Sequence, residues 1–337
     1  MALAEDNHSS GKTLIEAYVL GWELQGRLRA SSAANSNPAY HPPGLVGPLG
    51  GSVASAKVLG LDTHQTQMAL GIAASRTGGL TANTGTMVKS THPGNAARMG
   101  TEAAILAASG YTSSDSILEA PNGYSEALFQ GNMDWEILTK GLGESYRLVD
   151  PGFDIKRFPA QIHMQNTIEA VLNLRQNYNL QFQMIDHLTI HSRGRGHSGP
   201  LPISGLDGKF SIEYCSAAAL LDGKIGIETF TDNRRFSPDM EEALGKVRVV
   251  ADDTTQAVVT ATARLKDGTI VSAECSAFRG SASNPMSREE RLEKIWDCSR
   301  RTLSERDAER LLALLENLEH VSDICDIMEI LRPSAPE

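Results

Sequence analysis

The chain has 337 residues and a formal net charge of −10; 41% of its residues are hydrophobic and 21% are charged. This composition is typical of a globular protein of one or two domains, and an acidic balance without a lysine or arginine run argues against a general nucleic-acid binder. No apolar stretch approaches the roughly 18 residues of a membrane span, and the first residues lack the pattern of a signal peptide. We therefore predict a cytoplasmic protein with no nucleic-acid or membrane partner.

The first part of the chain is predicted to be helical. A pair of serines precedes a helix over residues 12–28 and can cap it. Residues 29–52 are rich in Ser, Asn, Pro and Gly, and we predict a loop there. Within this loop, the diproline that follows His41 restricts the histidine to an extended conformation. Two helices rich in small residues follow, in GSVASAKVLGL and THQTQMALGIAASR.

Residues 80–110 combine a polar, glycine-containing segment with an alanine-rich helix predicted over residues 95–109. The polar segment carries Lys89 and His92 and no acidic residue. These two side chains can hold a small anion, and the backbone N–H groups at the helix start would add to the attraction. The alternative from these residues alone is a solvated surface loop ahead of an ordinary core helix.

Short connectors are predicted over residues 113–150, and Pro151–Gly152 is the predicted domain boundary. The next segment places Lys156 and Arg157 at the entry of a helix. Two adjacent cations there can clamp a carboxylate, and an arginine can do so with two parallel hydrogen bonds. The alternative is an exposed basic pair that balances Asp154.

The second part of the chain alternates strands and helices. Strands are predicted in MIDHLTIHSR, KVRVVADD and AVVTATARLKDGTIVSAE, with Asp267–Gly268 as a turn. The chain then returns to helices. We predict an α+β fold with a mainly helical, discontinuous large domain from residues 1–150 and 281–337, and an inserted α+β lid domain over residues 151–280.

The four cysteines are far apart and show no CxxC spacing; they are Cys215, Cys275, Cys298 and Cys325. This spacing disfavours a zinc knuckle or an iron–sulfur cluster and is typical of buried thiols in a reducing cytosol. We therefore predict no metal and no cofactor.

Several blocks of the sequence resemble one protein family. TMVKSTHPGNAARMGTEAAILAASGY resembles the lysine loop of the MmgE/PrpD family, which includes 2-methylcitrate dehydratases, cis-aconitate decarboxylases and iminodisuccinate epimerases. The resemblance extends upstream through GLVGPLGGSVASAKVLGLD and ALGIAASRTGG, and downstream through DIKRFPAQIH, FSIEYCSAAALLDG and ARLKDGTIV. Collinear blocks over nearly the whole chain are more specific than one glycine-rich match. The resemblance implies two domains, a homodimer and an active site in the cleft between the domains.

The resemblance and the chemistry of an elimination together imply a set of site residues, which are the catalytic His41, Lys89, Lys156 and Tyr214 and the substrate-binding His92 and Arg157. The lysines would be cationic clamps, and the histidine and tyrosine of the catalytic set would carry protons.

Two departures from the family pattern stand out. Some members carry a histidine at the position of Gln161, and glutamine does not shuttle a proton at neutral pH.

The second departure concerns the helix over residues 12–28, which in family members lies well inside the sequence. The chain therefore resembles a member that lacks a long N-terminal portion, including a segment with an active-site Asp and His. With a longer N-terminus, a mitochondrial location would be the alternative to the cytoplasm. The missing segment also motivates a different class of function, a truncated inactive relative that acts as a dimerising or binding protein.

The first functional hypothesis is a lyase that dehydrates a 2-methylcitrate-like (alkylcitrate) tricarboxylic acid without a metal. Such an elimination needs a base for the proton beside a carboxylate, cations for the developing enediolate and an acid for the leaving hydroxide. Decarboxylation of cis-aconitate and epimerisation of iminodisuccinate are the alternatives, because both also pass through a carbanion-like intermediate. The expected partner in all three is a small polycarboxylate.

Overall fold

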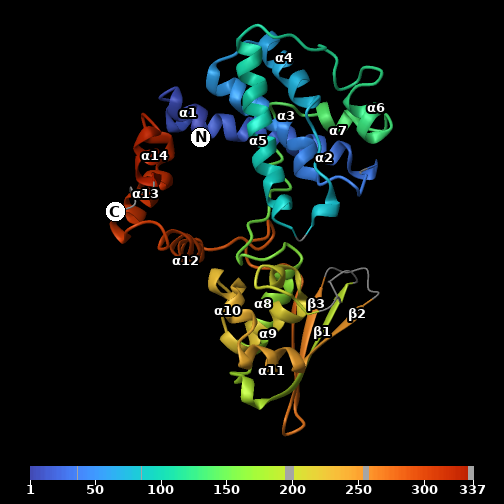
Figure 1. Cartoon of the computed structure of the whole chain (residues 1–337), viewed down its shortest axis with the longest axis vertical. Coiled ribbons are helices and arrows are strands. Elements are labelled where there is room, and N and C mark those ends of the chain that lie inside the picture. The colour runs from blue at the N-terminus through green and yellow to red at the C-terminus, as the bar shows by residue number, and fades with distance from the viewer. Residues whose placement is uncertain (36, 85, 194–200, 253–257, 333–337) are drawn as a thin grey trace. The chain divides into compact units, whose positions relative to one another are not determined.

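The structure is a computed structural model, and it describes the chain except for residues 36, 85, 194–200, 253–257 and 333–337. The chain divides into two compact units (Figure 1): Met1–Gly152 with Thr302–Glu337, here called the helical unit, and Phe153–Arg301, here called the α+β unit. The first segment of the helical unit ends at Gly152, and the sequence-based boundary was placed at Pro151–Gly152. Residues 281–301, which we had grouped with the helical domain, belong to the α+β unit.

The helical unit combines the helices of the first part of the chain with two α-helices from its last part. Its α-helices are α1 (Ala2–Asp6), α2 (Gly11–Ser31), α3 (Pro42–Leu59), α4 (Thr63–Ala74), α5 (Met87–Ala108), α6 (Tyr124–Phe129), α7 (Trp135–Thr139), α13 (Glu305–Glu316) and α14 (Cys325–Leu331). The 3-10 turns η1 (Ala33–Asn35), η2 (Thr81–Asn83) and η6 (Leu318–His320) lie between them. The predicted serine cap of α2 is confirmed, because Ser10 Oγ accepts a hydrogen bond from the Thr13 N–H at 3.2 Å.

Glycines let α2, α3 and α5 pack closely. A Cβ added to Gly21 of α2 would lie 2.8 Å from the Gly50 carbonyl oxygen, and one added to Gly100 of α5 would lie 2.6 Å from the Ser52 nitrogen. The prediction of a loop over residues 29–52 was wrong at both ends, because α2 continues to Ser31 and α3 begins at Pro42. Proline suits the first helical position, and tertiary packing outweighs the low helix propensity of the glycines that follow.

A buried arginine fixes the connector after α7 to α2. Arg27 is 4% exposed and donates hydrogen bonds to the carbonyl oxygens of Lys140 at 2.7 Å and Ser145 at 3.1 Å. Glu23, which pairs with Arg27, also accepts a hydrogen bond from the Arg147 N–H at 2.6 Å. Side chains of α2 therefore supply hydrogen-bond partners for the irregular backbone of this connector.

The α+β unit contains one mixed sheet in the order β2-β1-β3-β4, formed by β1 (Ile185–Arg193), β2 (Val247–Asp252), β3 (Val259–Leu265) and β4 (Ile270–Cys275). Its helices are α8 (Met164–Asn177), α9 (Ile212–Asp222), α10 (Asp232–Arg235), α11 (Pro238–Lys246) and α12 (Arg288–Ser299), with 3-10 turns η3 (Phe182–Met184), η4 (Asp207–Phe210) and η5 (Ile227–Phe230). The helices α8, α9 and α11 cover one face of the sheet (Figure 1). The predicted α+β class is confirmed.

The sheet combines parallel and antiparallel strand pairs. β3 pairs antiparallel with both β1 and β4, whereas β2 pairs parallel with β1. The predicted turn at Asp267–Gly268 is confirmed: Gly268 has a φ of +88°, and the Asp267 carboxylate accepts a hydrogen bond from the Thr269 N–H at 2.9 Å. Alternate residues of β3 are buried, so one face of the strand contributes to the core.

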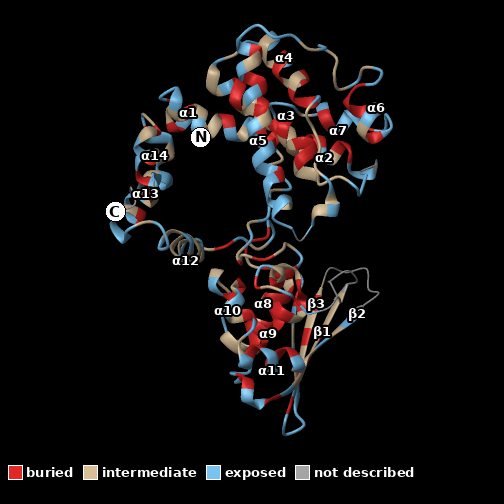
Figure 2. Ribbon diagram, in the orientation of Figure 1, coloured by how far each residue is buried: buried red, intermediate tan, exposed pale blue. Residues whose placement is uncertain are grey.

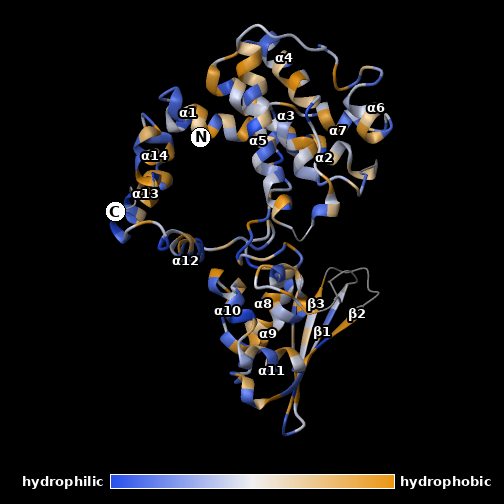
Figure 3. Cartoon of the chain, in the orientation of Figure 1, coloured by the Kyte–Doolittle hydropathy of each residue, from blue (hydrophilic) through white to orange (hydrophobic). Residues whose placement is uncertain are grey.

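The core of the α+β unit lies between its sheet and its helices. Buried residues gather on α8 and α9 in Figure 2, and the colouring of Figure 3 shows the apolar stretch of α9. Cys215 and Cys275 are buried there, as predicted for the thiols, but Cys298 is exposed and Cys325 is half-buried. Within the part of the chain that the structure describes, none of the helices has the length and apolar character needed to span a bilayer.

Candidate functional site

The backbone around His41 is held by hydrogen bonds with the backbone of Gly78 and Gly79. His41 precedes α3 in an extended conformation, with φ −78° and ψ 116°, as the diproline predicts. Its N–H donates to the Gly79 carbonyl oxygen at 2.9 Å, and the Gly78 N–H donates to the Gly44 carbonyl oxygen at 3.0 Å. A Cβ on Gly44 would lie 1.8 Å from the Gly78 oxygen, so only glycine permits this approach.

The second histidine of the site comes from α5. His92 is 7% exposed, and its ring lies over Gly79. Gly79 has a φ of +107°, and a Cβ there would lie 3.2 Å from His92 Cγ. Gly79 therefore serves both histidines, since its carbonyl oxygen accepts from the His41 backbone and its missing side chain leaves room for the His92 ring.

The two imidazole rings meet. His41 Nδ1 lies 3.1 Å from His92 Nδ1, with the ring centroids 5.2 Å apart. At this distance one nitrogen carries a proton and the other accepts it in a hydrogen bond. Partial burial lowers the pKa of His41, and the positive charge of Lys89 and the neighbouring His92 lower it further. These effects favour the neutral form of His41 in the free protein, and a negative charge bound nearby would oppose them.

Lys89 lies on a helix and not in a loop. The prediction that the helix begins at residue 95 was wrong, because α5 begins at Met87 and includes Pro93. Proline lacks the N–H that would bond to the Lys89 carbonyl, a local cost that the packing of α5 on α3 and α4 outweighs. Lys89 is half-buried and forms no ion pair within the described residues. Thr86, the residue before α5, provides no side-chain cap for the first N–H groups of the helix.

His41, Lys89 and His92, which we call the histidine–lysine cluster, are thus brought together by α3 and α5. The direct contact between the two rings was not predicted from the sequence. The glycine pair at residues 78–79 was the available signal, because adjacent glycines after a helix indicate a close approach of two backbones. The resulting cluster can attract an anion and exchange a proton with it.

Replacing Gly79 by alanine is expected to disturb this cluster. A non-glycine residue at such a φ costs about 1–3 kcal/mol, and the added Cβ would displace the His92 ring. We expect a corresponding loss in the free energy of unfolding, measured by urea denaturation, together with lower turnover. Gly78→Ala is the matched control, because its Cβ would meet nothing within 4 Å. Equal effects of both substitutions would contradict this role of Gly79.

The α+β unit contains a cavity of about 740 Å³, within the usual size range of small-molecule sites. Basic side chains line it, namely Lys156, Arg157, Lys224, Arg234, Lys294 and Arg300. Acidic side chains line it as well and balance several of these cations. Arg234 pairs with Asp222 at 2.7 Å, and Arg300 pairs with Asp297 at 2.7 Å. The cavity therefore has mixed charge.

The predicted substrate clamp is part of this cavity wall. Arg157 Nη1 lies 3.6 Å from carboxylate oxygens of both Glu169 and Glu290. Burial raises the pKa of Glu169, although the charge of Arg157 opposes this effect. Asp154 is engaged elsewhere, because its carboxylate accepts a hydrogen bond from the Ala282 N–H at 3.0 Å. Substrate binding by Lys156 and Arg157 stays a prediction, and for Arg157 a ligand would have to compete with two carboxylates.

Tyr214 is a packed core residue. It is fully buried, and its hydroxyl donates a hydrogen bond to the Thr229 carbonyl oxygen. Burial raises its pKa to about 12. A Cβ on Gly208 would lie 2.5 Å from the tyrosine ring, so the ring is held tightly. The proton-carrier role that the resemblance implied for Tyr214 stays a prediction, and this geometry gives it no support.

Both units of the chain resemble known proteins. The MmgE/PrpD N-terminal domain matches residues 1–136, and the MmgE/PrpD C-terminal domain matches residues 158–320. The chain belongs to the MmgE/PrpD family. Human cis-aconitate decarboxylase is 31% identical over 352 residues, which span 100% of this chain and 72% of the human protein. The mouse enzyme is 29% identical (98% of this chain, 70% of the relative), and one from Aspergillus terreus is 26% identical (98% and 72%).

Four of the candidate residues fall within the two regions that the family matches. The histidine–lysine cluster falls in the region matched by the N-terminal domain, and Tyr214 falls in the region matched by the C-terminal domain. Lys156 and Arg157 lie just ahead of the second match. The family and these relatives support an enzyme of the lyase class.

Proposed function

We propose that this MmgE/PrpD protein is a lyase that decarboxylates cis-aconitate or a closely similar tricarboxylate. The observation that carries the proposal is the histidine–lysine cluster, which combines a cation with two imidazoles whose Nδ1 atoms lie 3.1 Å apart. The names of the relatives support the choice of substrate, because the similar curated proteins are cis-aconitate decarboxylases or a decarboxylase-like protein.

Binding of a polycarboxylate would rest on three kinds of positive charge. The Lys89 ammonium supplies a full charge, and the uncapped N–H groups at the start of α5 supply the partial positive charge of a helix N-terminus. The imidazoles add a third source once protonated. A carboxylate bound here would raise the pKa of His41, so that the ring takes up a proton together with the substrate.

The cluster has the groups that decarboxylation of cis-aconitate requires. The bond between the methylene carbon and its carboxylate breaks, and carbon dioxide leaves. The electron pair moves through the carbon–carbon double bond and places negative charge on the carbon beside another carboxylate. Lys89 would stabilise this enediolate-like charge, and a protonated imidazole would deliver one proton to that carbon. The product is a dicarboxylate with a terminal methylene group.

Dehydration of a 2-methylcitrate-like acid is the second candidate, because the sequence resemblance includes that branch of the family. The same cluster would serve it: a neutral His41 would take the proton beside a carboxylate, and Lys89 would again hold the enediolate. The hydroxide would leave as water after it receives a proton from the imidazolium so formed. The relatives that are similar over the whole chain favour decarboxylation, so we place it first.

The experiment that tests the proposal is product analysis by nuclear magnetic resonance with a panel of cis-aconitate, 2-methylcitrate and iminodisuccinate. We expect carbon dioxide and a methylene-bearing dicarboxylate from cis-aconitate. Formation of an unsaturated tricarboxylate from 2-methylcitrate, without decarboxylation of cis-aconitate, would instead select the second candidate. No conversion of any of the three acids would contradict both.

A further inference from the structure

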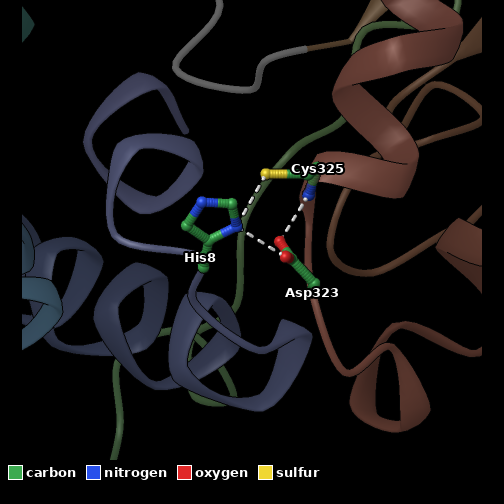
Figure 4. Close-up of side chains that lie close together, drawn as sticks. All are labelled: His8, Asp323 and Cys325. Atoms are coloured by element: carbon green, nitrogen blue, oxygen red, sulfur yellow. Dashed lines mark hydrogen bonds and ion pairs between the residues drawn. The ribbon is translucent and has the colours of Figure 1, made fainter.

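A second cluster of chemically reactive side chains lies elsewhere in the helical unit. His8, Asp323 and Cys325 come together from two segments that are far apart in the sequence (Figure 4). His8 Nδ1 lies 2.8 Å from Asp323 Oδ2 and 3.6 Å from Cys325 Sγ. The three potential ligand atoms all lie within 4.8 Å of one another. None of these residues belongs to the histidine–lysine cluster.

The spacing of the ligand atoms is close to that around a tetrahedral zinc ion. With zinc–nitrogen and zinc–oxygen bonds of about 2.0 Å and a zinc–sulfur bond of about 2.3 Å, the tetrahedral nitrogen–oxygen and nitrogen–sulfur separations are about 3.3 and 3.5 Å. The separations between His8 and its two neighbours are 2.8 and 3.6 Å. An outward shift of the Asp323 oxygen by about 0.5 Å would therefore bring the nitrogen–oxygen separation to the tetrahedral value.

The backbone holds these side chains in place without an ion. On either side of the cluster, the Ile324 N–H donates to the Ser9 carbonyl oxygen at 3.0 Å and the Gly11 N–H donates to the Val321 carbonyl oxygen at 2.8 Å. His8 itself has a φ of +47°, an uncommon backbone conformation that directs its ring toward the second segment. The site is therefore preorganised by contacts outside the ligand atoms.

The carboxylate is oriented as a metal-binding carboxylate usually is. Asp323 Oδ1 accepts a hydrogen bond from the Cys325 N–H at 2.9 Å, which leaves Oδ2 directed at His8. The His8 side chain is 75% exposed and that of Asp323 is 35% exposed, so an ion and a water molecule can reach the site. Three protein ligands and one water form a common zinc coordination.

We infer that His8, Asp323 and Cys325 form a binding site for a divalent ion of the zinc class, with water as the fourth ligand. A thiolate and an imidazole select zinc over magnesium or calcium, which prefer oxygen ligands. On binding, the Cys325 thiol releases its proton to solvent, and the ion, the thiolate and the carboxylate then sum to zero charge. The ion would link residues 1–11 to residues 318–331. This inference departs from our sequence-based prediction of no metal and does not rest on the proposed function.

The test uses the full chain, freed of metal by a chelator and titrated with zinc alone and with cobalt alone. We expect one equivalent of zinc to bind, and cobalt to give the near-ultraviolet band of a thiolate-to-cobalt charge transfer. Cys325→Ser should abolish the band, and both Cys325→Ser and His8→Gln should weaken zinc binding by at least about tenfold. Zinc, but not magnesium, should raise the Tm of the wild type.

Matched controls come from the same chain. Cys298→Ser removes an exposed thiol, and His320→Gln removes an exposed histidine close in sequence to the site. Both variants should retain the cobalt band and the zinc affinity of the wild type. The inference is overturned if the wild type shows no saturable binding of one equivalent, or if Cys325→Ser keeps the band. Because the test measures metal binding and not turnover, its failure would leave the proposed decarboxylation untouched.

Discussion

Replacement of Lys89 by alanine is expected to lower kcat by roughly 10²–10³-fold, the usual effect of removing one stabilising group from a developing negative charge. The free energy of unfolding should change by no more than about 0.5 kcal/mol, because Lys89 lies half-buried in the first turn of α5 without an ion pair among the described residues. Steady-state kinetics and urea denaturation of the same preparation measure both quantities.

Arg98→Ala is the matched control for this prediction. Arg98 is a cation on the same helix, its side chain is 66% exposed, and its weak pairing with Glu102 at 3.9 Å contributes little to stability. This variant should keep both activity and stability. If Lys89→Ala instead loses melting temperature in proportion to its activity, Lys89 is a structural residue and the cluster is not the reaction centre.

Replacement of His41 by glutamine is expected to lower kcat by roughly 10²–10⁴-fold, because glutamine keeps a hydrogen bond to His92 but transfers no proton at neutral pH. In the wild type, the pKa of His41 in the free protein lies below its ordinary value. If the imidazolium donates the proton, log(kcat/KM) should fall by about one unit per pH unit above that pKa. A bound polyanion raises the pKa, so kcat should stay level to a higher pH.

The pH–rate profile decides the role of His41 more directly than the rate alone. In His41→Gln the fall of kcat/KM near neutrality should disappear, whereas it should persist in His64→Gln, which replaces an exposed histidine of α4. A His41→Gln profile that keeps the wild-type shape would remove His41 from proton transfer. The residual activity would then have to come from another acid, and His92 would be the next group to replace.

The sequence predicted those features that depend on local chemistry. Ser10 caps α2 through its own side chain, Pro42 restricts His41 directly, and Asp267–Gly268 form a turn whose geometry their side chains favour. The α+β class followed from the spacing of apolar residues along the chain. This spacing differs between a helix that buries one face and a strand that buries alternate residues. For the candidate site, the sequence predicted individual residues, whose roles stay predictions, and it did not predict the contact between His41 and His92.

The features that the sequence did not predict depend on contacts between distant segments. Residues 42–52 and 87–94 are rich in glycine, proline and polar residues, and they become helical because α3 and α5 pack against each other. The contact between His41 and His92 follows from that packing. Tyr214 was assigned by resemblance, yet the structure gives it the environment of a core residue, which single-sequence reasoning cannot distinguish from a site residue.

The most direct test of the central claim is the release of carbon dioxide from cis-aconitate that is labelled with carbon-13 in its carboxylates. The label is followed by nuclear magnetic resonance for the wild type and for a variant that combines Lys89→Ala with His41→Gln. We predict that the wild type converts the label into carbon dioxide and a methylene-bearing dicarboxylate, whereas the double variant does so at a rate lowered by at least about 10²-fold. Arg98→Ala should match the wild type. Carbon dioxide release at the wild-type rate by the double variant would contradict the assignment of the reaction to the histidine–lysine cluster.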